Sequence, residues 1–96
     1  MITSKQRAYL RAQANAIETI FQIGKEGLGE NLPQELSAAL EKRELVKLRV
    51  LESCELSARE AAQALAQATG AEIVQVIGTR FVLYKESEKH KTISLD

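Results

Sequence analysis

The chain has 96 residues, the length of a single domain, so one modest core must support everything it does. Apolar residues make up 45% and charged residues 27%, a balance typical of a globular protein and not of a disordered or membrane-embedded chain. Lys and Arg total 13 and Asp and Glu total 13, so the formal net charge is zero, whereas many nucleic-acid-binding domains are basic overall. Any charge-driven binding must therefore depend on how the charges are distributed.

The sequence carries no signal for membrane insertion or secretion. No run of apolar residues approaches the roughly 20 that a membrane-spanning helix needs. Residues 1–5 lead directly into a helical pattern, without an apolar signal core or a small-residue cleavage site. A cytoplasmic protein is therefore expected.

The composition also argues against an enzyme or a metalloprotein. Cys54 is the sole cysteine and His90 the sole histidine, which excludes an intrachain disulfide and the common Cys/His zinc sites. With one histidine, in a polar tail, the sequence holds no Ser-His-Asp or Cys-His arrangement. We expect no catalytic site, no metal site and no cofactor, and we interpret Cys54 as a packed small hydrophobe in preference to a reactive thiol.

Two elements are predicted before the first glycine. Thr3 and Gln6 have the spacing of a capping box, and apolar residues follow at helical spacing, so a helix is expected over residues 4–15. Residues 18–23 are richer in β-branched and aromatic side chains and end at Gly24, which predicts a short strand.

A glycine-rich loop, residues 24–29, separates this strand from a second helix. Leucines recur at helical spacing from Leu32 and predict a helix to about Glu44. Pro33 is compatible with the start of this helix, because amide groups of the first turn have no intrahelical acceptor.

A second strand and a third helix follow. Residues 45–52 alternate, which predicts a strand whose buried face carries Val46, Leu48 and Val50. Ser57 and Glu60 form another capping box, an alanine-rich run continues the helix, and Gly70 stands where a left-handed C-terminal residue is expected.

The last part of the sequence has two strand-like runs, residues 72–77 and 80–85. Gly78-Thr79 between them predicts a type II′ hairpin. The expected fold is α/β, in the order α-β-α-β-α-β-β, with a four-stranded mixed sheet. We expect the second and third helices to cover the face of Val46, and the first helix to lie elsewhere against the sheet. Residues 86–96 form a charged tail without a clear pattern.

The loop between the first strand and the second helix could bind an anion. Gly24 and Gly27 have no β-carbon to hold a phosphate away from the backbone amides, and Lys25 adds a positive charge. A lone Gly-x-x-Gly is a weak signal, however, because many such loops are only turns that need a positive φ. The loop also lacks the terminal Lys-Ser/Thr of a nucleotide-binding P-loop.

Basic residues cluster in two further places and could line one surface. These residues are Arg7 and Arg11, four apart on the first helix, and Lys42, Arg43, Lys47 and Arg49 in and beside the second strand. The alternative is ordinary solvated charge, since Glu41 and Glu44 lie beside the second cluster and could neutralise it. The four aromatic residues are too few for a base-stacking sheet, and three of them are expected to pack.

Four ordered segments also resemble a known family over nearly the whole chain. They are Lys5-Gln6-Arg7 with Leu10-Arg11, Ile23-Gly24-Lys25-Glu26-Gly27-Leu28, Glu44-Leu45-Val46-Lys47-Leu48, and Gly70-Ala71 followed by Val74-Gln75-Val76-Ile77-Gly78 and Val82-Leu83-Tyr84-Lys85. Ile93-Ser94-Leu95 is similar to the family's ending. The family is the CRM domain, in particular its stand-alone bacterial YhbY-type RNA-binding proteins.

The resemblance implies an α/β domain that binds RNA and associates with the assembling large ribosomal subunit. It also implies a fold similar to the C-terminal domain of a bacterial translation initiation factor. The sequence departs from the family where Glu18-Thr19-Ile20 lacks a proline, where Gly29 replaces a hydroxyl residue that caps the second helix, and at Arg43 and Asp96.

Two functions remain in competition. In the first, basic side chains and the glycine loop hold the phosphates of precursor ribosomal RNA during large-subunit assembly. In the second, an exposed apolar patch docks on a ribosomal protein or assembly factor. The first requires a contiguous positive face, and the second requires an uncharged apolar one.

Overall fold

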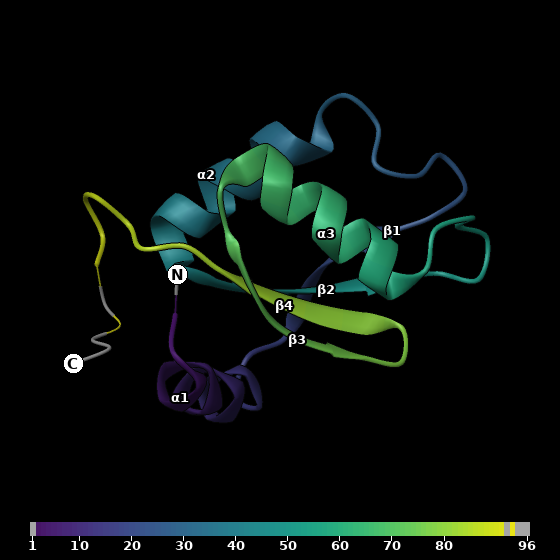
Figure 1. Cartoon of the computed structure of the whole chain (residues 1–96). Helices are drawn as coiled ribbons and strands as arrows, with labels where there is room; N and C mark the ends of the chain where they lie inside the picture. Colours follow the sequence, from purple (N-terminus) through teal and green to yellow (C-terminus); the bar gives the residue numbers. More distant parts are fainter. Residues whose placement is uncertain (1, 92, 94–96) are drawn as a thin grey trace.

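The computed structural model describes residues 2–91 and 93, and a four-stranded sheet lies between two layers of helices (Figure 1). The order of the elements is the predicted one. Their bounds are α1 (Ser4–Ala14), β1 (Thr19–Ile23), α2 (Leu32–Arg43), β2 (Leu45–Val50), α3 (Ala58–Thr69), β3 (Glu72–Ile77) and β4 (Arg80–Tyr84).

The strand order is β1-β2-β4-β3, so the last strand of the sequence lies between two earlier ones. β1 and β2 pair in parallel, because α2 carries the chain back along the sheet between them. β4 is antiparallel to both β2 and β3. The predicted four-stranded mixed sheet is therefore confirmed.

β3 and β4 form the predicted hairpin, in which Ile77 lies opposite Arg80. Gly78 has a φ of 57°, and Thr79 is not among the residues with a positive φ. This pattern is the one that a type II′ turn requires, because only its first central residue is left-handed.

The ends of α1 and α3 are fixed by the predicted caps. Thr3 and Gln6 exchange backbone and side-chain hydrogen bonds of 2.8 and 3.1 Å, and Ser57 and Glu60 do the same at 2.9 and 3.1 Å. Gly70 ends α3 with a φ of 77°. Among the described residues, no helix has both the length and the apolar character needed to cross a membrane.

The start of α2 corrects the expectation that Gly29 caps this helix. The residue at the N-cap is Asn31, whose side chain makes no capping hydrogen bond. Gly29 lies earlier, with a φ of 63°, so it is a left-handed turn residue. The remaining bounds differ from the predicted ones only slightly, since α1 ends at Ala14 and β2 at Val50.

α2 and α3 cover one face of the sheet, as predicted, and α1 covers part of the other (Figure 1). The larger cluster of buried side chains joins Val46, Leu48 and Val50 to α2 and α3. A smaller cluster joins α1 to the opposite face through Leu10, Ala14, Leu45, Val74, Val82 and Tyr84. β4 contributes side chains to both clusters, because successive side chains of a strand point to opposite faces of the sheet.

Two carboxylates hold the segment after β4 against the end of α2. Glu44, the fully buried C-cap of α2, accepts hydrogen bonds of 2.8 Å from the backbone N–H groups of Ser87 and Ile93. Glu41, one helical turn earlier, accepts the Ser87 hydroxyl at 2.6 Å and the N–H groups of Glu88 and Lys89. The tail expected to lack a pattern is therefore anchored at residues 87–89 and at Ile93, while Thr92, Ser94, Leu95 and Asp96 lie outside the described residues.

The anchoring by Glu41 is expected to weaken between pH 4.5 and 2. Hydrogen bonds from the Ser87 hydroxyl, and then from the N–H groups of Lys89 and Glu88, lower the pKa of Glu41 from 4.5 to about 2. Because the folded-state pKa is the lower one, the stabilisation is complete above pH 4.5 and is lost as the pH falls through about 2. An NMR titration of the amide signals of Glu88 and Lys89 measures this transition.

Glu41→Gln should remove that transition, and replacement of the exposed Glu52 by Gln is the matched control that should preserve it. Amide signals that stay constant down to pH 2 in the parent protein would contradict the assignment to Glu41.

Candidate nucleic-acid interface

Part of the α1 face of the sheet is not covered by a helix. α1 packs where β2 begins and β4 ends, over Leu45, Val82 and Tyr84. Toward the other end, the strand registers and the alternation of side chains place six mostly polar or charged residues on the same face. These residues are Gln22, Lys47, Arg49, Gln75, Ile77 and Arg80.

Lys47, Arg49 and Arg80 form what we call the basic sheet face. Arg49 on β2 lies directly opposite Arg80 on β4. Like charges in this arrangement, with β-carbons about 4.5–5.5 Å apart, destabilise a sheet. Within residues 2–91 and 93, no carboxylate pairs with any of the three side chains. The basic sheet face is therefore a local concentration of unbalanced positive charge in a protein of zero net charge.

Arg49 also has an unmatched hydrogen-bond donor. Its Nε is buried and has no hydrogen-bond partner among the described residues, although buried polar atoms in folded proteins are nearly always paired. Beside it, Lys47 and Arg80 line a small cavity of about 140 Å³ together with Gln75 and Ile77. Cationic donors around a cavity are suited to the oxygens of an anion.

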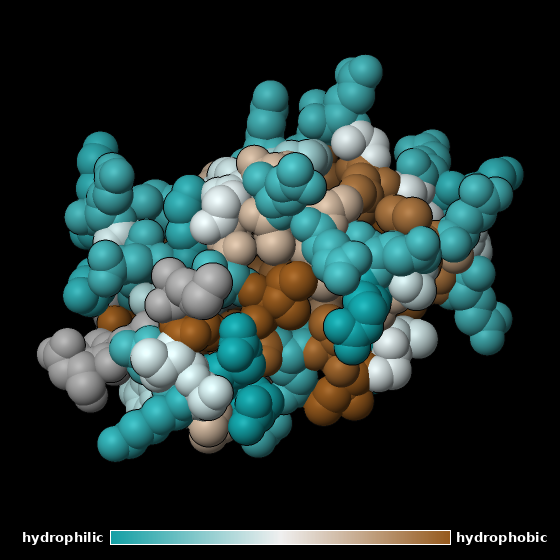
Figure 2. Space-filling view, viewed as in Figure 1, coloured by the Kyte–Doolittle hydropathy of each residue, from teal (hydrophilic) through white to brown (hydrophobic). Residues whose placement is uncertain are grey.

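One apolar side chain stands out on this part of the surface. Ile77 is 64% exposed, and Figure 2 shows apolar side chains emerging over the β3–β4 hairpin with hydrophilic ones around them. The apolar surface centred on Ile77 is thus bordered by charged side chains, which differs from the uncharged apolar face expected for the docking alternative.

The glycine loop lies beyond the carboxyl ends of β1 and β2. The Gly24 carbonyl accepts the Gly27 N–H at 2.9 Å, so residues 24–27 form a closed turn with Lys25 and Glu26 exposed at its tip. Gly27 has a φ of 69°. α2 begins only at Leu32, after the turn residues 28–31, so the amides of its first turn are separated in sequence from the loop.

The two glycines of this turn should respond differently to substitution. Gly27→Ala places a β-carbon on a left-handed residue and should lower the free energy of unfolding by about 1–2 kcal/mol. Gly24→Ala should be nearly neutral, because Gly24 has no positive φ and a β-carbon would meet Ser53 Oγ and Leu51 Cδ1 at 3.5 and 3.6 Å, which is ordinary contact. Urea unfolding of both variants measures the difference, and equal losses would show that the turn does not require a left-handed Gly27.

The two arginines of α1 do not join the basic sheet face. Arg7 Nε donates to the Ile73 carbonyl at 3.3 Å and so ties α1 to β3. β3 is separated from β2 by β4, which corresponds to about 10 Å between strands. Arg11 is exposed one helical turn later. Arg7 and Lys47 therefore lie on the same face of the sheet but are not direct neighbours, because β4 lies between β2 and the strand that Arg7 contacts.

Lys42 and Arg43 are exposed at the end of α2, where β2 begins. The neighbouring acids do not neutralise them in the expected way, because Glu41 and Glu44 direct carboxylate oxygens to the tail. The glycine loop lies at the other end of β2, whose six residues span about 17 Å. The predicted basic residues thus form a series along the sheet and not a single cluster.

Other kinds of site find no support among residues 2–91 and 93. These residues contain no group of three or more His, Cys, Asp or Glu side chains that could hold a metal ion. Cys54 is partly buried against the larger hydrophobic cluster, as expected. Phe21, Phe81 and Tyr84 pack in the clusters, and Tyr9 is the exposed aromatic, at 45%.

Arg80 is the candidate residue that sequence reasoning missed. It stands directly after the hairpin turn, and its alternation with Val82 could have placed it on the α1 face. Its neighbour across the sheet could not be inferred, because that depends on β4 inserting beside β2 in a particular register. The anchoring role of Glu41 and Glu44 had no sequence signal either.

These features define a class of small α/β domain with a helix-covered face and a partly open basic face. The CRS1/YhbY (CRM) domain profile matches residues 2–85, and the chain belongs to this family. It is 43% identical over 95 residues to the probable RNA-binding protein YqeI of Bacillus subtilis, covering 99% of both chains. It is 31% identical over 90 residues to a Haemophilus influenzae RNA-binding protein, covering 94% of this chain and 91% of the relative.

A solved structure supports the fold over the full length. The solution structure of the hypothetical protein SAV1595 from Staphylococcus aureus matches with a TM-score of 0.82 and 46% identity, covering 100% of both chains. The predicted family and fold class are therefore confirmed.

Proposed function

We propose that the protein binds structured RNA through the basic sheet face and the glycine loop. The observation that carries this proposal is the directly opposed pair of Arg49 and Arg80, which have no carboxylate partner among the described residues. A phosphate backbone supplies the negative oxygens that would relieve this repulsion and accept from the exposed donors of the two arginine side chains. The names of the Bacillus and Haemophilus relatives give independent support.

The binding mode follows from the chemistry of these side chains. Arginine can contact phosphate oxygens with two donors at once, whereas lysine acts as a point charge. Because the described aromatic side chains are mostly packed, stacking on an aromatic platform contributes little. RNA is therefore recognised mainly by backbone shape and charge, with Lys25 and the turn from Gly24 to Gly27 as the contact at the end of the sheet, where a β-carbon on Gly27 would meet only open space.

The RNA is proposed to be precursor ribosomal RNA of the large subunit, an extension that rests on the resemblance to YhbY-type proteins. Gradient fractionation of cell extracts tests it directly. The protein should co-sediment with immature large subunits and be largely absent from translating ribosomes. Recovery only with small subunits, or with no RNA-containing particle, would exclude this partner.

Salt dependence tests the mode of binding to ribosomal RNA. If about four phosphates are contacted, the logarithm of affinity should fall with the logarithm of salt concentration at a slope of roughly −3. Lys25→Ala should reduce affinity without loss of stability, because the side chain is exposed. Affinity that is indifferent to salt would instead favour docking on a ribosomal protein through the surface around Ile77.

A further inference from the structure

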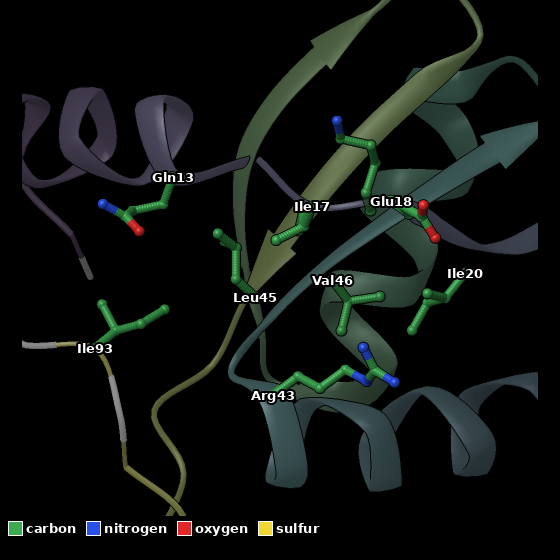
Figure 3. A pocket seen from close by; sticks show the side chains of 9 residues that line it. Gln13, Ile17, Glu18, Ile20, Arg43, Leu45, Val46 and Ile93 are labelled. Carbon is green, nitrogen blue, oxygen red and sulfur yellow. The ribbon is translucent and has the colours of Figure 1, made fainter. Parts of the chain in front are cut away.

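A second, larger cleft opens at the corner of the sheet where β2 begins (Figure 3). Its volume is about 390 Å³, within the range of roughly 300–1,000 Å³ found for small-ligand clefts. Side chains of α1, the α1–β1 connection, β1, β2 and the end of α2 line it together with Ile93 of the tail, and we call it the corner cleft. It is distinct from the cavity of the basic sheet face, but Lys47 lines both.

The corner cleft exists because β1 does not extend along the whole of β2. The pairing begins with Thr19 opposite Lys47, so Leu45 and Val46 have no strand beside them on the β1 side among the described residues. An unpaired strand edge presents backbone N–H and C=O groups. The corner cleft therefore has a hydrogen-bonding edge on one side.

The remaining walls combine apolar and charged groups. Ile17 and Ile20 supply apolar surface, and Ile20 is 39% exposed. Figure 3 shows the Gln13 amide entering from α1 on the side of Ile93, and the Arg43 guanidinium lying near Val46. Glu18 places one carboxylate at the rim.

We propose that the corner cleft receives one unpaired nucleotide of the bound RNA, with its base against Ile17 and Ile20 and its phosphate on Arg43 and Lys47. This inference rests on the proposed function. A nucleobase has apolar faces and a polar edge, and the corner cleft offers apolar walls beside a strand edge and an amide. Lys47 lines both the cavity of the basic sheet face and the corner cleft. An RNA strand that crosses the basic sheet face can therefore continue into the corner cleft while its phosphates stay close to positive charge.

The charges of the lining favour a nucleotide over a peptide segment that would pair with the edge of β2. Arg43 and Lys47 outnumber Glu18, so the corner cleft attracts an anionic backbone. Glu18 adds selectivity if it faces position 4 of a pyrimidine, because its carboxylate accepts from the amino group of cytosine there and repels the carbonyl oxygen of uracil. The inferred ligand is an unpaired amino-bearing nucleotide, cytidine before uridine.

Three RNAs that differ at one position test the inference on the full chain. They are a perfect duplex, the same duplex with one unpaired cytidine, and the same duplex with one unpaired uridine. The cytidine bulge should bind about fivefold more tightly than the perfect duplex, because one face of the base becomes buried against apolar side chains. Equal affinities for these two RNAs would overturn the inference and leave the cleft to a protein segment. Absence of binding to all three would overturn the proposed function itself.

Two variants locate the base. Ile20→Ala should bring the bulge-to-duplex ratio close to one, whereas Ile77→Ala, on the basic side of the sheet, should change both affinities by the same factor. Glu18→Gln should make the affinities for the cytidine bulge and the uridine bulge equal. Comparing the two bulges on the same variant removes the general gain in affinity for RNA that comes from losing a negative charge. If Ile20→Ala has a lower melting temperature than the parent protein, Gln13→Ala is used in its place, because Gln13 is exposed, and the same loss of the bulge-to-duplex ratio is expected. Unchanged ratios in the folded variants would show that the base lies elsewhere.

Discussion

Replacing Arg49 and Arg80 together by alanine should weaken RNA binding by about 30- to 100-fold at roughly 0.1 M salt, because each loses charge-assisted hydrogen bonds to phosphate. Arg80→Ala alone should not make the protein easier to unfold. Two arginines directly opposite each other on β2 and β4 repel by about 0.2–1 kcal/mol, and removing one relieves this repulsion. Opposite effects on binding and stability are the signature of residues retained for a ligand and not for the fold.

Electrophoretic mobility shifts and thermal melting measure the two effects on the same samples. Arg59→Ala is the matched control, since Arg59 is exposed on α3, which packs on the other face of the sheet. It removes one positive charge, as Arg80→Ala does, and should leave affinity unchanged. The double variant should also reduce the magnitude of the salt slope by about 2, one for each phosphate that an arginine no longer neutralises. Loss of stability in Arg80→Ala with intact RNA binding would contradict the assignment.

Glu44→Ala should lower the free energy of unfolding by about 3 kcal/mol, the largest loss of stability that we expect from a single polar residue here. The side chain is fully buried and accepts from the backbone N–H groups of Ser87 and Ile93. Alanine leaves both donors unmatched and keeps the positive φ of 65°. Urea unfolding at neutral pH measures the loss.

Two further substitutions separate the carboxylate from the backbone. Glu44→Gly should be less destabilising than Glu44→Ala by about 1 kcal/mol, because glycine adopts a left-handed φ without a steric cost. Glu88→Ala, in the same tail, should be neutral because this side chain is exposed. If Glu44→Ala unfolds with the same free energy as the parent, the tail is not held by this carboxylate.

Local sequence patterns predicted most of the fold because the signals were themselves local. The Thr3–Gln6 and Ser57–Glu60 caps, the left-handed Gly70 and the Gly78 turn each depend on a few adjacent residues. The C-cap at Glu44 escaped prediction because a non-glycine residue rarely takes a positive φ. Here hydrogen bonds to the distant tail hold it in place.

The site was predictable only in part, for a related reason. Lys47 and Arg49 could be placed on one face by alternation within their own strand. Their meeting with Arg80 depends on pairing between β2 and β4, segments more than 30 residues apart in the sequence. Lys42 and Arg43 lie at one end of β2 and the glycine loop lies at the other, so the length of β2 separates them.

The position of β4 has a consequence for how the chain folds as it is synthesised. Phe81 and Leu83 complete the cluster on one face of the sheet, while Val82 and Tyr84 complete the cluster on the other. Until residues 80–84 have left the exit tunnel, β2 and β3 have no strand between them and neither cluster can close. Such sequence-distant pairing forms slowly, because a long loop must close before its contacts contribute. Neither face of the nascent domain can therefore close before the last strand arrives, so the two hydrophobic clusters depend on the same late segment.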